Sequence, residues 1–221
     1  MEQIEELGRH AAPAAQPQPL AFLGDTLWIG CWGTSSLYAV DPRTWTVLDR
    51  VEAPGRPYGL AALDGELRAV VSIGEDDDRF FYRFVPGSGF DAASKRPCPE
   101  FTGSHLVADG STLYLVQATN RRILELDGDL TTKREIALPT RIAGLAPRDG
   151  AFLAITADAE FDNLTLATLD LSRDIAEVEE FAVMPPEARG LAFDGSAWWT
   201  NLREENLTLS FVPPAVPARS A

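Results

Sequence analysis

The sequence predicts an all-β fold, a single five-bladed β-propeller of four-stranded antiparallel blades whose ring is closed by the N-terminal strand. Three observations predict it: a motif repeated at nearly constant spacing, four short strands within each repeat, and a fifth repeat that lacks its last strand. Most copies of the motif read Leu, Ala, a spacer, Asp and Gly, and their leucines are Leu20, Leu60, Leu106, Leu145 and Leu191. Successive leucines lie 40, 46, 39 and 46 residues apart. A period of about 40 to 45 residues built from short strands is typical of propeller blades.

Each of the first four repeats divides into four expected strands. In the first repeat these are residues 20–23, 26–31, 36–40 and 46–51, separated by turns rich in aspartate and glycine. Short segments enriched in β-branched and aromatic residues between such turns are typical of strands. The strands expected in the next three repeats are 60–63, 66–73, 79–85 and a less regular stretch ending near residue 101; 106–108, 112–118, 122–127 and 133–138; and 145–147, 151–157, 164–171 and 176–184.

The fifth repeat has only three expected strands, at 191–193, 197–200 and 207–212, before the chain reaches Pro213 and Pro214. Proline has no backbone N–H to donate to a ladder, so the tail is a poor fourth strand. Residues 2–8 resemble the outer strands of other repeats, and we expect them to complete the last blade and close the ring. An ordinary β-sandwich, which also has short strands at regular spacing, is the alternative.

The chain of 221 residues fits one domain of this kind. We expect the closing strand and its link, the five blades and a C-terminal tail to occupy, in order, residues 1–19, 20–57, 58–102, 103–142, 143–187, 188–214 and 215–221.

The charge of the chain argues against two classes of partner. Its formal net charge is −14, whereas sequence-independent nucleic-acid binding draws its affinity from neutralised phosphates. An anionic membrane surface is disfavoured for the same reason, and no apolar run approaches the length of a membrane span. We therefore expect a cytoplasmic protein that binds neither nucleic acid nor membranes, with Cys31 and Cys98 as free thiols.

Propeller geometry brings polar residues of different repeats together at one rim of the central channel. The segments that lead into each repeat, and the loops between second and third strands, meet there, and such a concave site is the default place for a ligand. The channel-facing residues expected from the leading segments are Gln18, Tyr58, Ser104, His105, Ile142 and Arg189. The loops are expected to add Trp32, residues 75–79, Asn120, Arg121, Asp158, Glu160, Asp162, Asn201, Arg203 and Glu204.

Two of these residues carry the chemistry. His105 is a candidate catalytic acid or base, because the unperturbed pKa of histidine lies near neutrality; the alternative is a packed, hydrogen-bonded side chain. Arg189 precedes the Gly-Leu pair of the fifth repeat and could bind a carboxylate or phosphate; the alternative is an ion pair with a neighbouring blade. Tyr58 and Trp32 are expected to form the apolar walls. The remaining candidate ligand-binding residues are Ser104, Asn120, Asp158 and Asn201.

The sequence predicts no metal centre. Residues 75–78 read Glu-Asp-Asp-Asp but lack the spacing and the glycine of a calcium-binding loop, so we interpret them as a solvated loop. The two histidines and two cysteines lie at unrelated spacings, which does not match a zinc site. Nucleotide-binding fingerprints and the Gly-x-Ser-x-Gly elbow of many hydrolases are absent too, and the cofactor is left open.

The segment "LGDTLWIGCWGTSSLYAVDPRTWTVLDRV", Leu23 to Val51, resembles the blades of the NHL, YVTN and virginiamycin B lyase group of propellers, and "RPYGLAALDGEL", Arg56 to Leu67, is similar. Five blades, together with the Asp-Pro turn at Asp41, are also similar to glutamine cyclotransferases. The Asn-Glu-Leu-Glu and Glu-Gly-Leu-Thr segments of that family are absent here. The resemblance thus implies the scaffold, with His105 as the one candidate for lyase chemistry.

These observations favour a small-molecule-binding propeller that holds a polar or anionic ligand in the rim cavity, with lyase or cyclase activity of the acid/base type as a further expectation. The alternative is a non-enzymatic scaffold that contacts a protein partner. A flat, apolar rim would favour the scaffold, whereas converging polar groups would favour the ligand site.

Overall fold

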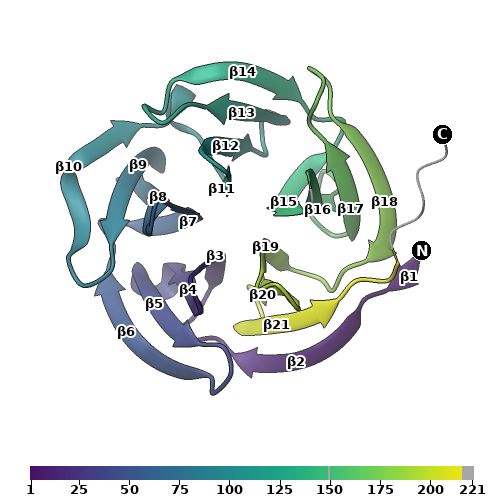
Figure 1. Ribbon diagram of the computed structural model, residues 1–221, viewed down its shortest axis with the longest axis horizontal. Coiled ribbons are helices and arrows are strands. Elements are labelled where there is room, and N and C mark those ends of the chain that lie inside the picture. The colour runs from purple at the N-terminus through teal and green to yellow at the C-terminus, as the bar shows by residue number, and fades with distance from the viewer. Residues whose placement is uncertain (149, 216–221) are drawn as a thin grey trace.

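The computed structural model describes residues 1–148 and 150–215, which form five β-sheets arranged around a central axis. Figure 1 shows the sheets as the blades of a five-bladed propeller, each running from an inner strand near the axis to an outer strand at the perimeter. The all-β, five-bladed prediction is therefore confirmed. Within the described residues, no helix is both long and apolar enough to cross a bilayer.

The first three blades follow the chain in order from the axis outward. Blade 1 consists of β3 (Pro17–Leu23), β4 (Thr26–Cys31), β5 (Ser36–Asp41) and β6 (Thr46–Glu52), with the short helix η1 (Trp32–Thr34) between β4 and β5. Blade 2 consists of β7 (Arg56–Leu63), β8 (Glu66–Ile73), β9 (Asp78–Val85) and β10 (Gly89–Pro97), followed by the short helix η2 (Pro99–Phe101). Blade 3 consists of β11 (His105–Asp109), β12 (Thr112–Gln117), β13 (Arg122–Leu126) and β14 (Thr132–Ala137).

The last two blades share the chain's N-terminal segment. Blade 4 consists of β15 (Arg141–Arg148), β16 (Ala151–Ala157), β17 (Leu164–Asp170) and β18 (Glu177–Val183), with β1 (Glu2–Gln3) added in parallel at its outer edge. Blade 5 consists of β19 (Ala188–Phe193), β20 (Trp198–Leu202), β21 (Leu207–Val212) and β2 (Glu5–Ala11).

The N-terminal segment closes the ring, as predicted, although its bounds differ from those expected. Strand β2 runs antiparallel to β21, with Glu5 opposite Val212 and Ala11 opposite Leu207. Residues 2 and 3 instead pair with β18 of the neighbouring blade. Between the two pairings, Ile4 packs against the hydrophobic cluster that blades 4 and 5 share. The first eleven residues therefore join two blades as well as completing one.

The repeated Leu-Ala pair is a packing motif between blades. Because successive side chains of a strand point to opposite faces, the leucine of each inner strand packs toward the preceding blade and the next residue toward the following blade. In blade 2, Leu60 joins a cluster with Trp28 of blade 1, whereas Ala61 joins a cluster with Leu115 of blade 3. Burying one such leucine stabilises the fold by about 1.5 to 3 kcal/mol, and every junction contains one repeat leucine within a larger apolar cluster.

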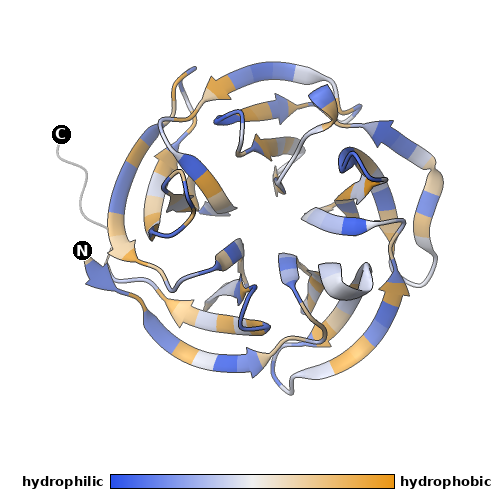
Figure 2. Cartoon of the chain, turned by 180° about the vertical axis from the view of Figure 1, so that it is seen from behind, coloured by the Kyte–Doolittle hydropathy of each residue, from blue (hydrophilic) through white to orange (hydrophobic). Residues whose placement is uncertain are grey.

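Glycines let the inner strands approach one another at the start of these motifs. A Cβ atom on Gly59 would lie 2.7 Å from the backbone nitrogen of Leu106, and one on Gly144 would lie 2.8 Å from the backbone of Gly190. Both distances are shorter than side chains tolerate, so glycine is required there. The outer strands are more variable, and Figure 2 shows them alternating between hydrophilic and hydrophobic residues.

Candidate functional site

A cavity of about 370 Å³ opens at the end of the channel where the inner strands begin, and we call it the polar mouth. All five blades contribute to it. Its lining consists of Gln18, Trp32, Tyr58, Arg79, Thr102, Gly103, Ser104, His105, Ala118, Thr119, Ile142, Ala143, Glu160, Phe161, Glu187, Arg189 and Arg203.

Irregular strand pairing aims several of these side chains at the axis. A shift in ladder register re-orients the side chain at the shift, and such shifts are common beside functional sites. The register shifts at the start of four inner strands, between Pro17 and Leu20 in β3, Pro57 and Gly59 in β7, Ile142 and Gly144 in β15, and Arg189 and Ala192 in β19. The residues at these shifts that reach the cavity are Gln18, Tyr58, Ala143 and Arg189.

His105 lines the polar mouth and directly precedes the repeat leucine of blade 3. At the equivalent position, blades 2, 4 and 5 have glycine. The His105 side chain is 5% exposed. Burial, first, and the positive charge of Arg189, second, lower the pKa of His105 to about 3, although a backbone hydrogen bond with Ala143 opposes the shift. The imidazole is therefore neutral at physiological pH. It can exchange hydrogen bonds with a ligand, but it is a weak base.

Arg189 is the most deeply buried cation of the polar mouth, with a side chain 6% exposed. One guanidinium nitrogen, Nη1, donates to the carbonyl of Ala188 at 2.9 Å, and Nη2 lies 3.2 Å from the carboxylate of Glu187. The same Glu187 oxygen lies 3.2 Å from Nη2 of Arg203. Glu187 thus serves two arginines, and Arg203 also lies 3.7 Å from the carboxylate of Glu204. Burial lowers the pKa of Arg189, and Glu187 partly offsets this.

The wall of the polar mouth is a stack of two rings and two guanidinium groups. Trp32 and Tyr58 lie with ring centroids 4.4 Å apart, and the indole Nε1 donates to the carbonyl of Pro57 at 2.5 Å. Arg203 lies 5.2 Å from the Trp32 ring and Arg79 lies 3.5 Å from the Tyr58 ring. Cations at these distances are attracted to ring faces. The expected apolar wall is therefore an aromatic wall covered by positive charge.

Asp77 fixes the outer part of this wall. It lies 2.9 Å from Arg56 and 2.8 Å from Arg79, and it accepts a hydrogen bond from the Tyr58 hydroxyl at 3.1 Å. Burial would raise the pKa of Asp77, but the hydrogen bond from Ser72 and the charge of Arg79 hold it below its usual value. Asp77 is thus an ion-paired residue that positions arginines. Glu75 and Asp76 are exposed, as expected of a solvated loop, whereas Asp78 is half-buried at the start of β9.

The polar mouth gathers three arginines although the protein is strongly anionic, with a formal charge of −14. Arg79, Arg189 and Arg203 line it together with Glu160 and Glu187. Asp77 and Glu204, outside the lining, pair with Arg79 and Arg203, so Arg189 is the arginine that depends most on Glu187 for a countercharge.

The structure brings five of the eight predicted site residues together: Trp32, Tyr58, Ser104, His105 and Arg189 all line the polar mouth. The Ser104 hydroxyl donates to the carbonyl of Val116 at 3.1 Å, so it is already engaged.

The other three predicted residues do not line the cavity, because each is bonded elsewhere. Asn120 donates to Glu100 at 3.0 Å on the exposed surface. Asp158 accepts hydrogen bonds from residues 162 and 163 of its own loop. Asn201 is fully buried behind the site, where it donates to the carbonyl of Gln18 at 3.3 Å and accepts from Thr208 at 2.7 Å. These three residues therefore lie outside the lining of the polar mouth, and their contact with a ligand stays a prediction.

Among the lining residues that sequence reasoning missed, Phe161 and Glu187 contact Arg189. Both adopt left-handed backbone conformations, with φ of 63° and 59°, which the sequence does not announce. Glu187 had one detectable signal: it lies two residues before Arg189, and alternate residues of an extended segment point to the same side. Gln18, Arg79 and Arg203 were placed at the rim from the sequence, but without a specific role.

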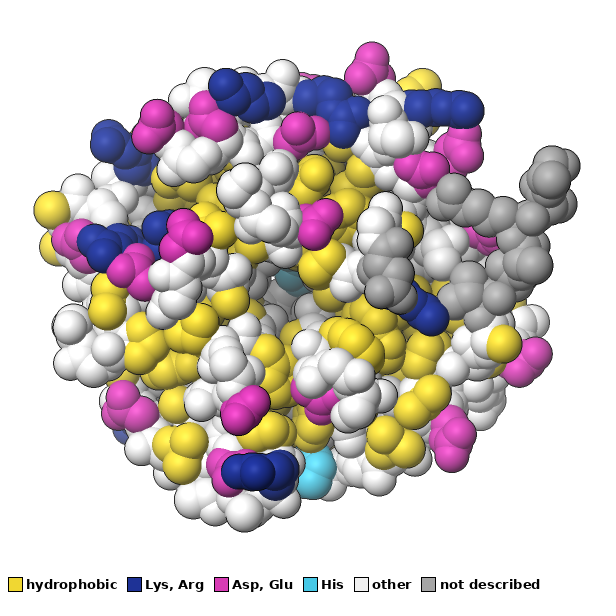
Figure 3. Space-filling view, in the orientation of Figure 1, with side chains coloured by type: hydrophobic (Ala, Val, Ile, Leu, Met, Phe, Trp, Pro, Cys, Tyr) yellow, Lys and Arg dark blue, Asp and Glu magenta, His cyan; other side chains and the backbone are white. Residues whose placement is uncertain are grey.

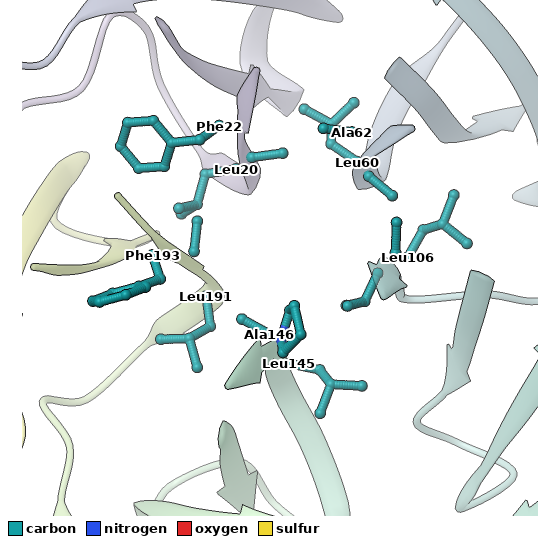
Figure 4. Close-up of a pocket in the computed structure, with 15 residues that line it drawn as sticks. Leu20, Phe22, Leu60, Ala62, Leu106, Leu145, Ala146, Leu191 and Phe193 are labelled. Atoms are coloured by element: carbon teal, nitrogen blue, oxygen red, sulfur yellow. The ribbon is translucent and has the colours of Figure 1, made fainter. Parts of the chain in front are cut away.

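A second cavity, of about 250 Å³, opens at the opposite end of the channel, and we call it the apolar mouth. Its lining consists of three residues from each inner strand and contains no charged side chain. Figure 4 shows the repeat leucines Leu20, Leu60, Leu106, Leu145 and Leu191 around it. In the space-filling view of this face, hydrophobic side chains surround the central hollow and most charged side chains lie toward the perimeter (Figure 3).

Neither metal ligands nor a disulfide mark the described part of the chain. Residues 1–148 and 150–215 contain no group of three or more histidine, cysteine, aspartate or glutamate side chains placed to hold a metal ion. Cys31 and Cys98 are free and buried. Burial raises the pKa of the Cys31 thiol to about 12, and it raises that of Cys98 further.

The fold is similar to that of several solved propellers. Glutaminyl cyclase from Myxococcus xanthus matches with a TM-score of 0.73 and 14% identity, covering 98% of this chain and 100% of that one. Virginiamycin B lyase from Staphylococcus aureus matches with a TM-score of 0.53 and 13% identity, covering 92% and 68%. Hydrazine synthase from Kuenenia stuttgartiensis matches with a TM-score of 0.54 and 19% identity; the match covers 96% of this chain, which spans only 60% of that one.

No protein-family model matches the chain, and no curated protein matches it either. The structural matches confirm the resemblance to the virginiamycin B lyase group and to five-bladed cyclases at the level of the scaffold. Because identities this low accompany several different chemistries, what the chain shares with these proteins is its fold.

Proposed function

We propose that this propeller binds a small organic carboxylate in the polar mouth, with Arg189 as its anchor. The observation that carries the proposal is the buried guanidinium of Arg189, which lines the cavity and shares its carboxylate partner, Glu187, with Arg203 at 3.2 Å from each. A planar guanidinium matches the geometry of a carboxylate, and a water-poor site strengthens the attraction.

Binding is better supported than acid/base turnover. A general base works best with a pKa near the operating pH, and the pKa of His105 is about 3. The neutral imidazole at the floor is suited instead to hydrogen bonding with the carboxylate or its substituents. Lyase or cyclase chemistry would need another proton-transfer group in the polar mouth.

The scaffold alternative has less support. A protein-docking scaffold is expected to present a flat, apolar rim, but the apolar residues of this propeller line a hollow at the apolar mouth. The five repeat leucines there are each at most 4% exposed, because they are packed between blades.

Calorimetric titration with succinate tests the proposed function. We expect saturable binding to the full-length protein, weakened in Arg189→Ala by about 1.5 to 3 kcal/mol, the range for hydrogen bonds to charged groups. Arg203→Ala is the second variant, because its more exposed side chain can be removed with less risk to folding. Arg173→Ala is the matched control, since Arg173 forms an exposed pair with Glu177 outside the cavity. Equal affinity in folded Arg189→Ala, or no saturable binding to the wild type, would refute the proposal.

A further inference from the structure

Among the described residues, the one buried side-chain acceptor without a hydrogen-bond partner belongs to Gln18 in the polar mouth, where Nε of Arg79 is an unpartnered donor. Gln18 is 4% exposed and lines the cavity, yet its side-chain oxygen Oε1 has no hydrogen-bond partner. Buried side-chain polar atoms are normally bonded, and an unmade bond costs stability. An unpartnered acceptor on a side chain that lines a cavity therefore points to a donor supplied by a ligand.

The main chain at Gln18 is held in place. Its carbonyl accepts a hydrogen bond from Asn201 at 3.3 Å, and Asn201 is in turn held by Thr208 at 2.7 Å. A Cβ atom on Gly190 would lie 2.8 Å from that same carbonyl, so β19 and β3 are in close contact here. Gln18 and Arg189 consequently sit side by side on neighbouring inner strands.

The neighbouring polar groups at the floor have other partners. Arg189 donates to the carbonyl of Ala188 and pairs with Glu187. His105 has a backbone hydrogen bond with Ala143. The side-chain oxygen of Gln18 has no such partner and can accept a hydrogen bond from a ligand.

Building on the proposed function, we propose that Gln18 is a specificity-determining residue that selects 2-hydroxy carboxylates. The Gln18 oxygen accepts a hydrogen bond from a hydroxyl next to the carboxylate that Arg189 binds, since the two side chains come from adjacent strands. A neutral hydroxyl fits better than an ammonium group, because the cation Arg189 lies on the adjacent strand and would repel a second positive charge. One ligand would then donate its hydroxyl to the Gln18 oxygen and bind Arg189 through its carboxylate.

Malate and succinate test this inference, because they differ by one hydroxyl group. In calorimetric titrations of the full-length wild type, we expect malate to bind about three- to tenfold more tightly than succinate, as one neutral hydrogen bond provides. One malate enantiomer should bind more tightly than the other, because Gln18 lies on one side of the anchor.

In Gln18→Leu, we expect malate and succinate to bind with equal affinity and the enantiomer preference to disappear. Succinate affinity is measured alongside, so that lost discrimination is separated from a general loss of binding, and the midpoint of thermal unfolding should not fall, since the substitution removes an unpartnered group. Gln3→Leu, an exposed position of β1, is the matched control and should leave all three affinities unchanged.

The possible failures are distinguishable. Equal binding of malate and succinate by the wild type, or discrimination that persists in Gln18→Leu, would overturn the role of Gln18 and leave the anion site intact. If neither compound binds the wild type, the proposed function fails and this inference fails with it.

Discussion

At the scale of single residues, His105 is the clearest departure from the repeat. Three of the other four blades place glycine before the repeat leucine, and the inner strands there touch through their backbones. At blade 3 an imidazole takes that place and is kept neutral by burial and by the positive charge of Arg189. The same residue that could serve a ligand therefore also makes folding sensitive to pH.

We expect the protein to lose stability as the pH falls from 7 to 5. The unfolded imidazole takes up a proton below a pH of about 6.5, whereas the pKa of folded His105 is about 3. The unfolded state then binds more protons, which favours unfolding by about 2 kcal/mol at pH 5. Thermal unfolding at several pH values measures this. Below pH 5 the carboxylates contribute as well, so the window above it reports on histidine.

His105→Asn should remove most of this dependence, while lowering stability at pH 7 through lost packing. His10→Asn provides the control for the second histidine, whose pKa burial also lowers. An unchanged slope between pH 7 and 5 in folded His105→Asn would show that the imidazole is not held neutral.

At the scale of elements, the inner strands determine both the packing and the site. Their leucines join the blades, while their first residues line the polar mouth. Close approach of these strands needs glycine, which gives a matched pair of substitutions. Gly144 faces the backbone of Gly190, whereas Gly128 has no atom within 4 Å of a built Cβ.

Gly144→Ala should lower the free energy of unfolding by about 1 to 3 kcal/mol, the usual cost of forcing atoms into a packed region. Gly128→Ala should change it little, because the added methyl group meets open space. Chemical denaturation of both variants measures the difference. Equal stabilities would mean that the inner strands can move apart without cost, contrary to the close packing described above.

At the scale of the whole molecule, the ring depends on its first eleven residues. Strand β2 pairs with β21, and His10 stacks on Trp45 of blade 1 at 4.3 Å and lies 6.0 Å from Trp199 of blade 5. Trp45 also donates to the carbonyl of Ala11 at 2.7 Å. Strand β2 is thus tied to blade 1 as well as to blade 5.

Deleting residues 1–11 should open the ring and lower the midpoint of thermal unfolding. The loss removes a ladder of hydrogen bonds, each worth about 1 kcal/mol net, and exposes an unpaired strand edge. Adding a peptide of residues 1–12 should restore the midpoint. A truncated protein that unfolds at the wild-type midpoint would refute closure by this strand.

Much of the architecture could be predicted because it depends on local patterns. The spacing of the leucines reflects one packing unit repeated five times. The prolines after Val212 exclude a further strand there, so the N-terminal segment, residues 2–8, was the remaining candidate to complete the last blade. The site was harder to predict. Asn120 and Asp158 lie in loops of the expected kind, but short polar side chains in turns bond to nearby partners instead.

The sequence by itself determined the five blades, the ring closure and the inner-strand positions of Tyr58, His105 and Arg189, because side-chain alternation and turn chemistry act over a few residues. Only the tertiary structure decided which polar groups remain available at the polar mouth. The sharing of Glu187 by two arginines and the unpartnered oxygen of Gln18 depend on distances between blades far apart in the chain. Such long-range pairing decides the charge and the hydrogen bonding of the cavity, and no local pattern encodes it.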